Sequence, residues 1–230
     1  MSTLTPRLDA AFSRVLFLFL PAALSMVAAT PVQAQTVDEA LIDIENRWAS
    51  AVYESSGRGK KKALTQLLQD ARKFASSHAS DPKAVGWHGI IARECIRAGC
   101  KSPAGRLRKE ARDALLKAES LDARALGGRI YANLGALYAQ TSSQFGGFGS
   151  DVKGIGYLWS ALVVDPDCLE SNYLYAELLV KEKNLTEALK VLRKASETPA
   201  RPEHLLADRG RHRQIISLLK TVESRIDRTS

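Results

Sequence analysis

Apolar residues recur at intervals of three and four along most of the chain, which is the spacing of amphipathic helices. The first such stretch carries Leu41, Ile44 and Trp48, and another runs from Lys60 to about His78. Segments rich in Gly, Ser, Asn and Pro separate these stretches, as expected for turns between helices. The pattern therefore predicts an all-α fold over residues 35–230.

The stretch from 169 to 199 is typical of two helices joined by a tight turn at Lys183 and Asn184. Asn184, with Glu187 three residues later, resembles a capping box that would start the second helix. Small residues mark predicted helix contacts, and bulky residues one turn away would fill the spaces between them. The small ones are Ala176, Ala188 and Ala195, and the bulky ones are Tyr175, Leu179 and Leu192. Such a pair cannot bury its apolar face alone, so we expect it to stack on neighbouring pairs.

The preceding segment carries the same arrangement, which resembles the tetratricopeptide repeat (TPR). Its first helix matches the W-x2-L-G-x2-Y signature with Tyr in place of Trp, and its second follows the small, bulky, small pattern. The matching residues are Tyr131, Leu134, Gly135 and Tyr138, then Gly154, Leu158 and Ala161. We expect a TPR-like α-solenoid of about four helix pairs, with earlier helices continuing the pattern.

A final helix from Glu203 to about Ile226 is expected to cap this array. Its predicted apolar stripe consists of Leu205, Leu206, Ile215, Ile216, Leu218, Leu219 and Val222. Its predicted polar outer face consists of Arg209, Arg211, Arg213 and Arg225. A polar outer face is what a terminal helix needs in contact with water.

Two repeats are longer than the pattern requires. Ala92 and Ala111 are separated by as many residues as Gly135 and Gly154, about seven more than the repeat spacing. We expect two extended loops at one edge of the solenoid, from Gly99 to Gly105 and from Gln140 to Ser150. Two loop residues, Phe145 and Phe148, would either pack back on the helices or contact a ligand.

The first helices of a TPR solenoid line its concave surface, and they supply the predicted binding residues. These are Arg93, Arg97, Arg129, Tyr173 and Glu177, with Gly86, Gly89 and several alanines leaving room between them. The arginines would make one end basic, while Glu170 and Glu177 would make the other acidic. Arginine suits a carboxylate partner, so a protein segment or a small anionic ligand is expected there. The alternative is an internal network of Arg–Glu pairs without a ligand.

Residues 1–34 have the pattern of an export signal. A basic start at Arg7 and Arg14 precedes an apolar run, and Val32-Gln33-Ala34 resembles a cleavage site. We expect a periplasmic or secreted domain over 35–230 without stable membrane insertion after cleavage. An uncleaved N-terminal anchor is the alternative.

The chain of 230 residues has a formal net charge of +8. Residues 35–130 hold 18 Lys and Arg against 12 Asp and Glu, whereas residues 131–230 hold 13 against 12. A basic first half favours an acidic protein, an anionic ligand or a membrane surface as partner, unless it serves only solubility. Nucleic acid is disfavoured by the export signal, and oligomerisation is left open.

Cys95 and Cys100 are close enough in sequence to form a disulfide in an oxidising compartment, or Cys95 is simply a small core residue. No histidine or cysteine spacing indicates a metal site, and no nucleophile or phosphate-binding motif is present. We therefore expect no catalytic residues, no cofactor and no enzymatic activity.

From about Arg108 to Leu219 the sequence resembles exported bacterial TPR proteins associated with TRAP-type solute transporters. Several short segments carry the resemblance, and the first of them is rich in glycine. They are Phe145 to Asp151, Lys153-Gly154, Ala161-Leu162, Asp165-Pro166, Tyr173 to Glu177 and Leu206 to Asp208. The resemblance implies a binding or scaffold protein, or an accessory ligand-binding subunit of such a transporter.

Overall fold

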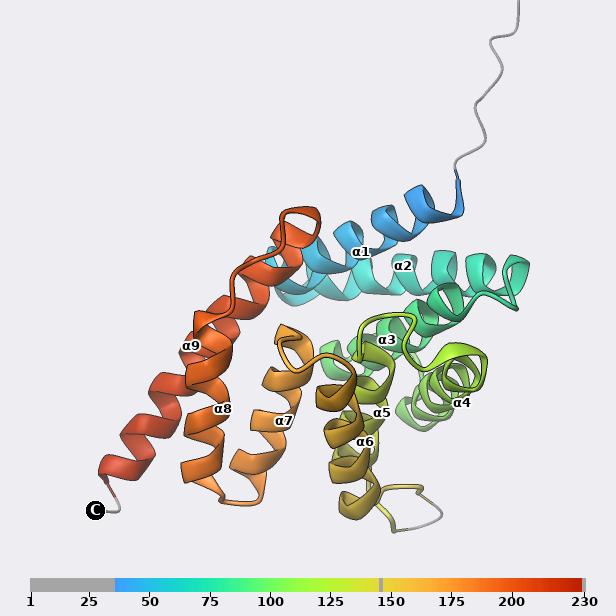
Figure 1. Cartoon of the computed structure of the whole chain (residues 1–230). Coiled ribbons are helices and arrows are strands. Elements are labelled where there is room, and N and C mark those ends of the chain that lie inside the picture. Colours follow the sequence, from blue (N-terminus) through green and yellow to red (C-terminus); the bar gives the residue numbers. More distant parts are fainter. Residues whose placement is uncertain (1–35, 145–146, 229–230) are drawn as a thin grey trace, which may run out of the picture. The chain divides into compact units, whose positions relative to one another are not determined.

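A computed structural model describes residues 36–144 and 147–228 (Figure 1). The helices, in chain order, are α1 (Val37–Tyr53), α2 (Gly57–Ser77), α3 (Pro82–Ala98), α4 (Ala104–Asp122), α5 (Arg129–Gln140), α6 (Asp151–Val164), α7 (Leu169–Lys181), α8 (Leu185–Glu197), the 3-10 helix η1 (Pro202–His204) and α9 (Leu205–Asp227). This described part of the chain contains no strand, so the all-α prediction is confirmed there. The predicted export signal lies outside the described residues.

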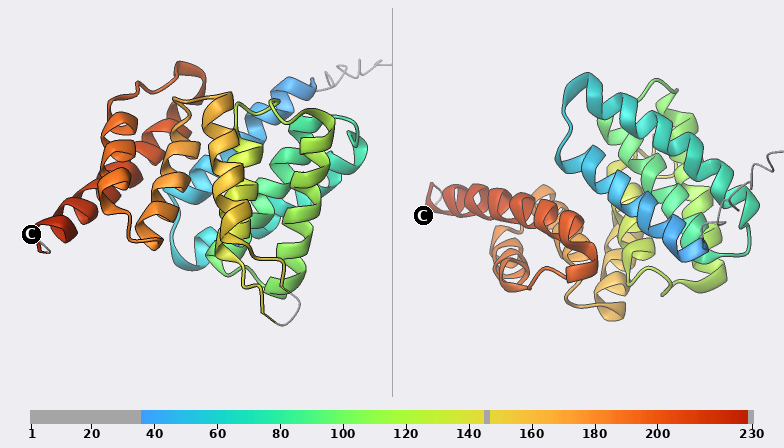
Figure 2. Two further views of the ribbon diagram at one scale, coloured as in Figure 1. Left: turned by 60° about the horizontal axis from the view of Figure 1, so that its bottom comes forward. Right: turned by 90° about the horizontal axis from the view of Figure 1, so that it is seen from above.

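Helices that follow one another in sequence pack as pairs: α1 with α2, α3 with α4, α5 with α6, and α7 with α8. The first helices of the pairs also contact each other, so that α1, α3, α5 and α7 form an inner layer. The second helices of the last three pairs, α4, α6 and α8, lie outside this layer (Figure 2). The chain is thus arranged as neighbouring helix pairs, in the order of the sequence.

The α5 helix joins two hydrophobic cores through its two faces. Ile130 and Leu134 pack with the apolar residues of α1 to α4, while Ala132 and Ala136 pack with those of α6 to α9. The alternation of large and small residues follows from helical periodicity, which places these two sets on different faces. The α5 helix therefore packs against both hydrophobic cores and connects them.

Most of the small and bulky positions predicted from the repeat spacing are buried at helix contacts, whereas Tyr131 and Tyr175 are only half-buried. Ala176, Ala188 and Leu192 are fully buried between α7 and α8. Where α5 crosses α6, a Cβ atom added to Gly135 would lie only 2.8 Å from the carbonyl oxygen of Gly154. The small residues are needed here because the two backbones approach each other directly.

Side-chain caps begin α3 and α8, and the cap at Asn184 was predicted. The Asp81 carboxylate accepts hydrogen bonds from the first turn of α3, and the Asn184 side chain accepts one from the Glu187 amide. Between α4 and α5 the helical pattern is interrupted, and α5 begins only at Arg129. Gly127 and Gly128 both have positive φ angles, and this left-handed backbone interrupts the helix.

The two predicted long loops differ in length, although both repeats carry the same number of extra residues. Between α3 and α4 the extra residues extend the helices, which are 17 and 19 residues long, against 12 and 14 for α5 and α6. Residues 104–110 include Ala, Leu, Arg, Lys and Glu, which favour helix, whereas residues 141–150 are rich in Gly and Ser. In the second insertion, the described residues 141–144 and 147–150 therefore lie outside the helices.

The α9 helix does more than cap the array. It contacts α8 and α7, and its first half also reaches α1 at the other end of the inner layer. In Figure 1 it begins beside α1 and then runs along α8. Gly210 permits this contact, because a Cβ atom there would lie 2.2 Å from the Tyr53 ring. The helix thus connects the first and last pairs.

The predicted faces of α9 are wrong at three positions. Arg211, assigned to the outer face, is 3% exposed, whereas Leu205 and Ile216, assigned to the apolar stripe, are exposed. The buried face is Ala207, Arg211, Ile215 and Val222, whose intervals of four, four and seven fit one side of a helix. The prediction failed because an arginine was assumed to face water.

Candidate functional site

The buried Arg211 of α9 lies at the centre of a polar cluster on the inner layer. Its Nη2 atom donates a short hydrogen bond to Glu170 of α7. Its guanidinium lies over the rings of Tyr173 in α7 and Tyr53 in α1, at 4.5 and 5.6 Å from the ring centroids. The side chain is therefore held by two helices that are far apart in sequence.

Arg129, at the start of α5, is held in a similar way. Its Nη1 donates to Glu45 of α1 over 2.8 Å, and its guanidinium lies 5.5 Å from the centroid of Trp87. Glu45 also lies 2.9 Å from the Nδ1 atom of His204. The carboxylate of α1 thus links α5 to the segment that precedes α9.

The other two predicted groove arginines belong to α3. Arg93 is fully buried and donates to Glu94 over 3.3 Å and to Asn133 over 3.1 Å. Arg97 is half-buried, and its Nη1 lies 3.7 Å from a carboxylate oxygen of Glu177. The Arg97–Glu177 pair joins α3 to α7 across the inner layer.

The sequence had suggested that one end of the groove is basic and the other acidic. In the structure, positive and negative side chains instead alternate along the inner layer. Carboxylates that were not predicted, Glu45 and Glu94, and the unpredicted Arg211 alternate with the predicted groups. Arg93 and Arg129 form ion pairs within the protein, as expected for the alternative of an internal Arg–Glu network. Their role in ligand binding stays a prediction.

Burial and pairing act in opposite directions on the ionisation of this network. Burial raises the pKa of Glu170, but the guanidiniums of Arg211, Arg93 and Arg129 outweigh it and leave that pKa below its ordinary value. For Arg211, burial lowers the pKa, but the Glu170 carboxylate, with Tyr53 and Glu94, raises it further than burial lowers it. Both partners are therefore charged at neutral pH.

An open cavity of about 380 Å³ remains beside the network, between α5, α7 and α9. Its wall is mainly apolar, and its lining residues are Ala136, Ala139, Gln140, Leu174, Glu177, Leu178, Val180, Lys181 and Leu218. Tyr173 donates a 2.9 Å hydrogen bond to Glu177 and so orients that carboxylate at the cavity wall. Of the predicted groove residues, Glu177 lines this cavity, and Arg97 lines a smaller one beside it.

Gly89, predicted to face the groove, instead marks a close contact with the outer helix α4. A Cβ atom on Gly89 would lie 2.6 Å from the side chain of Leu115. The room in the groove comes from Ala136 and Ala139 of α5. The prediction for Gly89 was wrong because the sequence does not distinguish a small residue at a tight helix crossing from a small residue that lines a groove.

A second cavity, of about 530 Å³, lies at the edge where α4 begins and α5 ends. Gly105, the last residue of the first predicted loop and part of α4, and Ser142 of the second predicted loop both line it. A joint surface of the two loops stays a prediction. Phe148 packs edge-on against Tyr138 at 5.5 Å and beneath the guanidinium of Arg112 at 4.7 Å. Phe148 therefore packs back on the helices while still lining the cavity, and Phe145 lies outside the described residues.

Among the described residues, no group of three or more His, Cys, Asp or Glu side chains is placed to hold a metal ion. Within the same part of the chain, none of the helices combines the length and apolar character needed to cross a membrane.

Cys95 and Cys100 lie together at the end of α3, with their Sγ atoms 2.6 Å apart. The left-handed backbone of Gly99 turns the chain so that Cys100 folds back onto the helix. Both side chains are buried, and Cys95 is the less exposed of the two. Burial raises the pKa of the Cys95 thiol, so we expect the better exposed Cys100 to react first with an external disulfide.

We predict that these two thiols form a disulfide when the protein is made in an oxidising compartment. The mass of the unreduced protein should be lower by two hydrogen atoms than that of the reduced protein. Cys95→Ser should abolish the difference, and Cys168→Ser should retain it. Loss of the difference in the Cys168→Ser control would instead implicate Cys168. The gain in stability should be modest, because the closed loop is short.

Comparison with known proteins does not assign this chain to a family. No family model matches the sequence, and no curated protein matches it.

Proposed function

We propose that this chain is an exported, non-enzymatic TPR-like binding protein that holds a partner on the inner side of its helix pairs. The ligand would be a segment of another protein, or a small anionic molecule. Export is supported by the pattern of residues 1–34, and the TPR-like character by the repeat spacing and the buried small residues.

The observation that carries the proposal is the 380 Å³ cavity between α5, α7 and α9. It combines an apolar wall, including Leu174 and Leu218, with a few polar groups at Gln140, Glu177 and Lys181. Binding cavities typically have this composition, since apolar surface supplies affinity and isolated polar groups fix orientation. The neighbouring Arg97–Glu177 pair is only half-buried, so a carboxylate or an amine of a ligand can compete for either partner.

A second candidate is an accessory ligand-binding subunit of a TRAP-type solute transporter. It is favoured by the resemblance of the segment from Arg108 to Leu219. The same cavity would then hold the solute or a segment of the solute-binding protein.

Photo-crosslinking from two positions on α9 tests the proposal. A photo-reactive amino acid replaces either Leu218, which lines the cavity, or Ile216, which is exposed nearby on the same helix. We expect a discrete adduct in cells from position 218 and none from position 216, because only the first faces the bound partner. Absence of an adduct or ligand at 218, or equal labelling at both positions, would count against the proposal. A solute-binding protein in the adduct would favour the transporter subunit.

A further inference from the structure

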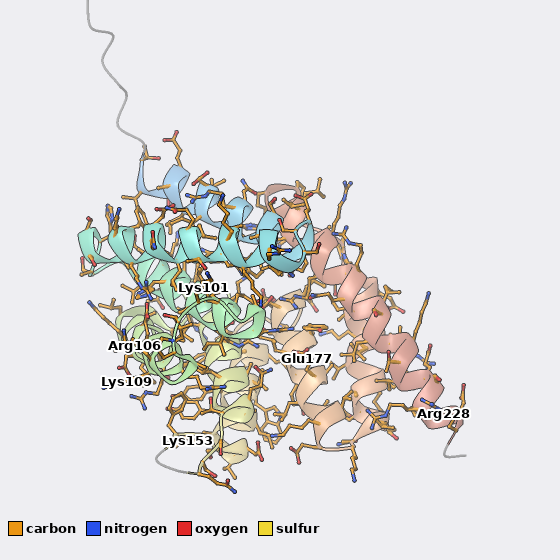
Figure 3. The ribbon with its side chains drawn as sticks, turned by 180° about the vertical axis from the view of Figure 1, so that it is seen from behind. Lys101, Arg106, Lys109, Lys153, Glu177 and Arg228 are labelled. Carbon is orange, nitrogen blue, oxygen red and sulfur yellow. The ribbon has the colours of Figure 1, made fainter. Side chains whose placement is uncertain are left out.

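A run of basic side chains occupies the edge where α2 and α4 begin and where α5 meets α6. We call it the basic edge, and its residues are Arg58, Lys61, Lys62, Lys101, Arg106, Arg108, Lys109, Arg112 and Lys153. The start of α2 reaches this edge because the Cys100 thiol lies 3.8 Å from the carbonyl oxygen of Lys61. Figure 3 shows Lys101, Arg106, Lys109 and Lys153 on the same side of the molecule, away from Arg228.

The basic edge carries an excess of positive charge that the chain itself leaves mostly unpaired. Residues 57–62, 99–109 and 140–150 contain no Asp or Glu. Of the nine cations, Arg112 forms an ion pair with Asp113, and the others have no carboxylate partner among the described residues. This contrasts with the inner layer, where Arg93, Arg129 and Arg211 are all paired.

The N-termini of α2 and α4 add to the positive electrostatic potential of the basic edge. The first turns of α2 and α4 carry no acidic residue, and neither N-cap side chain accepts a hydrogen bond. The first turns of α1 and α8, by comparison, contain acidic residues and have side-chain caps. The positive end of a helix dipole disfavours nearby cations, so basic residues there cost stability in the isolated protein. A bound anion would relieve that repulsion.

The basic edge is hollowed as well as charged. The 530 Å³ cavity is lined by Gly105, Arg108, Lys109, Arg112, Gln140, Thr141, Ser142, Gln144, Gly147 and Phe148. Cations lie on its α4 wall, hydroxyl and amide groups lie on its loop wall, and the half-buried Phe148 ring lies between them. Such a recess suits an extended chain that presents carboxylates, backbone amides and occasional apolar side chains.

We propose that the basic edge is a docking site for an acidic segment of a partner protein. The inference deepens the proposed binding function and rests on it, but it concerns a different surface from the inner cavity. Asp or Glu carboxylates pair with Arg108 and Lys109, and the peptide backbone bonds to the hydroxyl and amide wall. A flat anionic membrane would reach the surrounding lysines but not the recessed groups, so the cavity favours a peptide.

Binding of defined anionic probes to the purified domain tests this inference. Fluorescence anisotropy measures the affinity of a labelled oligoglutamate peptide, and an oligothymidylate and phosphatidylglycerol vesicles serve as the other anions. The variant Arg108→Glu/Lys109→Glu reverses two charges in the cavity. The matched control, Arg213→Glu/Lys220→Glu, makes the same change in net charge at two exposed positions on α9.

We expect the cavity variant to bind oligoglutamate about tenfold more weakly or worse, since it loses two charge-assisted contacts and adds repulsion. The control should lose much less, and Phe148→Ala should weaken binding in the same direction as the cavity variant. Equal losses in both double variants would overturn the inference, because binding would then depend only on net charge. Tighter binding to oligothymidylate or to vesicles than to the peptide would also overturn it.

The failure of this inference can be separated from the failure of the proposed function. Arg97→Gln removes the ion-pair partner of Glu177 at the inner cavity, and it should leave oligoglutamate binding unchanged. Peptide binding without an adduct at position 218 would support the basic edge and count against the inner cavity. An adduct at 218 without peptide binding would do the reverse.

Discussion

Replacement of Arg211 by Met is expected to destabilise the domain by about 3–5 kcal/mol. The change leaves the Glu170 carboxylate buried without its closest cation, and it removes the cation that lies over Tyr173 and Tyr53. A buried charge that loses its partner costs far more than the pair contributes, because it has already lost its contacts with water. Chemical denaturation of the variant and the wild type measures the difference.

Two further variants show whether this loss comes from the ion pair. Arg209→Met, on the exposed side of the same helix, should change the stability by less than about 0.5 kcal/mol. The double variant Arg211→Met/Glu170→Met should recover most of the loss, because it removes both buried charges together. A double variant as unstable as the single one would show that the packing of the arginine, and not its charge, is what matters.

The pH dependence of the same variant follows from the lowered pKa of Glu170. A carboxyl whose pKa is lower in the folded state stabilises the fold above its ordinary pKa of 4.5, and this contribution is lost as the pH falls. The wild type should therefore lose part of its advantage over Arg211→Met below about pH 4.5. A gap in unfolding free energy that stays constant from pH 7 to about pH 3 would contradict this assignment.

Replacement of Gly135 by Val is expected to destabilise the contact between α5 and α6 by about 1–3 kcal/mol. The new Cβ atom would lie 2.8 Å from the carbonyl oxygen of Gly154 and 3.0 Å from the backbone nitrogen of Leu158. Backbone atoms of a packed helix cannot move aside as a flexible side chain can, so the two helices must separate. In a domain of this size the melting temperature should fall by roughly 2–4 °C for each kcal/mol.

Gly156, in the same pair, supplies the matched control. No atom lies within 4 Å of a Cβ added there. Gly156→Ala should therefore raise the stability by about 0.5–1 kcal/mol, because alanine loses less conformational freedom in a helix than glycine does. If both variants shifted the melting temperature in the same direction, the close approach of the two backbones would not be the cause.

Much of the helix packing could be predicted from the sequence, because it depends on local spacing. Ala188, Leu192 and Ala195 lie three or four residues apart, and this spacing is enough to place them on one buried face. The capping residue Asn184 was also identified, since its hydrogen bond reaches only three residues ahead.

The polar cluster could not be predicted in the same way, because it depends on contacts between distant segments. Glu170 and Arg211 are 41 residues apart, and Glu45 and Arg129 are 84 apart. One signal was nevertheless present in the sequence. Arg211 lies four residues after Ala207 and four before Ile215, so it belongs to the apolar face of its helix. A charged residue in such a position indicates a buried ion pair.

The contact between α9 and α1 has a consequence for how the domain folds. In an open array of repeats each pair touches only its neighbours, so folding can start anywhere and spread. Here the last helix packs against the first, and Tyr53 meets Gly210 and Arg211 only after all the intervening pairs are in place. Contacts of such long sequence separation slow folding, since the chain must close a large loop before it gains their energy. The domain should therefore unfold as one cooperative unit, and a chain that ends before α9 would leave Glu170 buried without its cation.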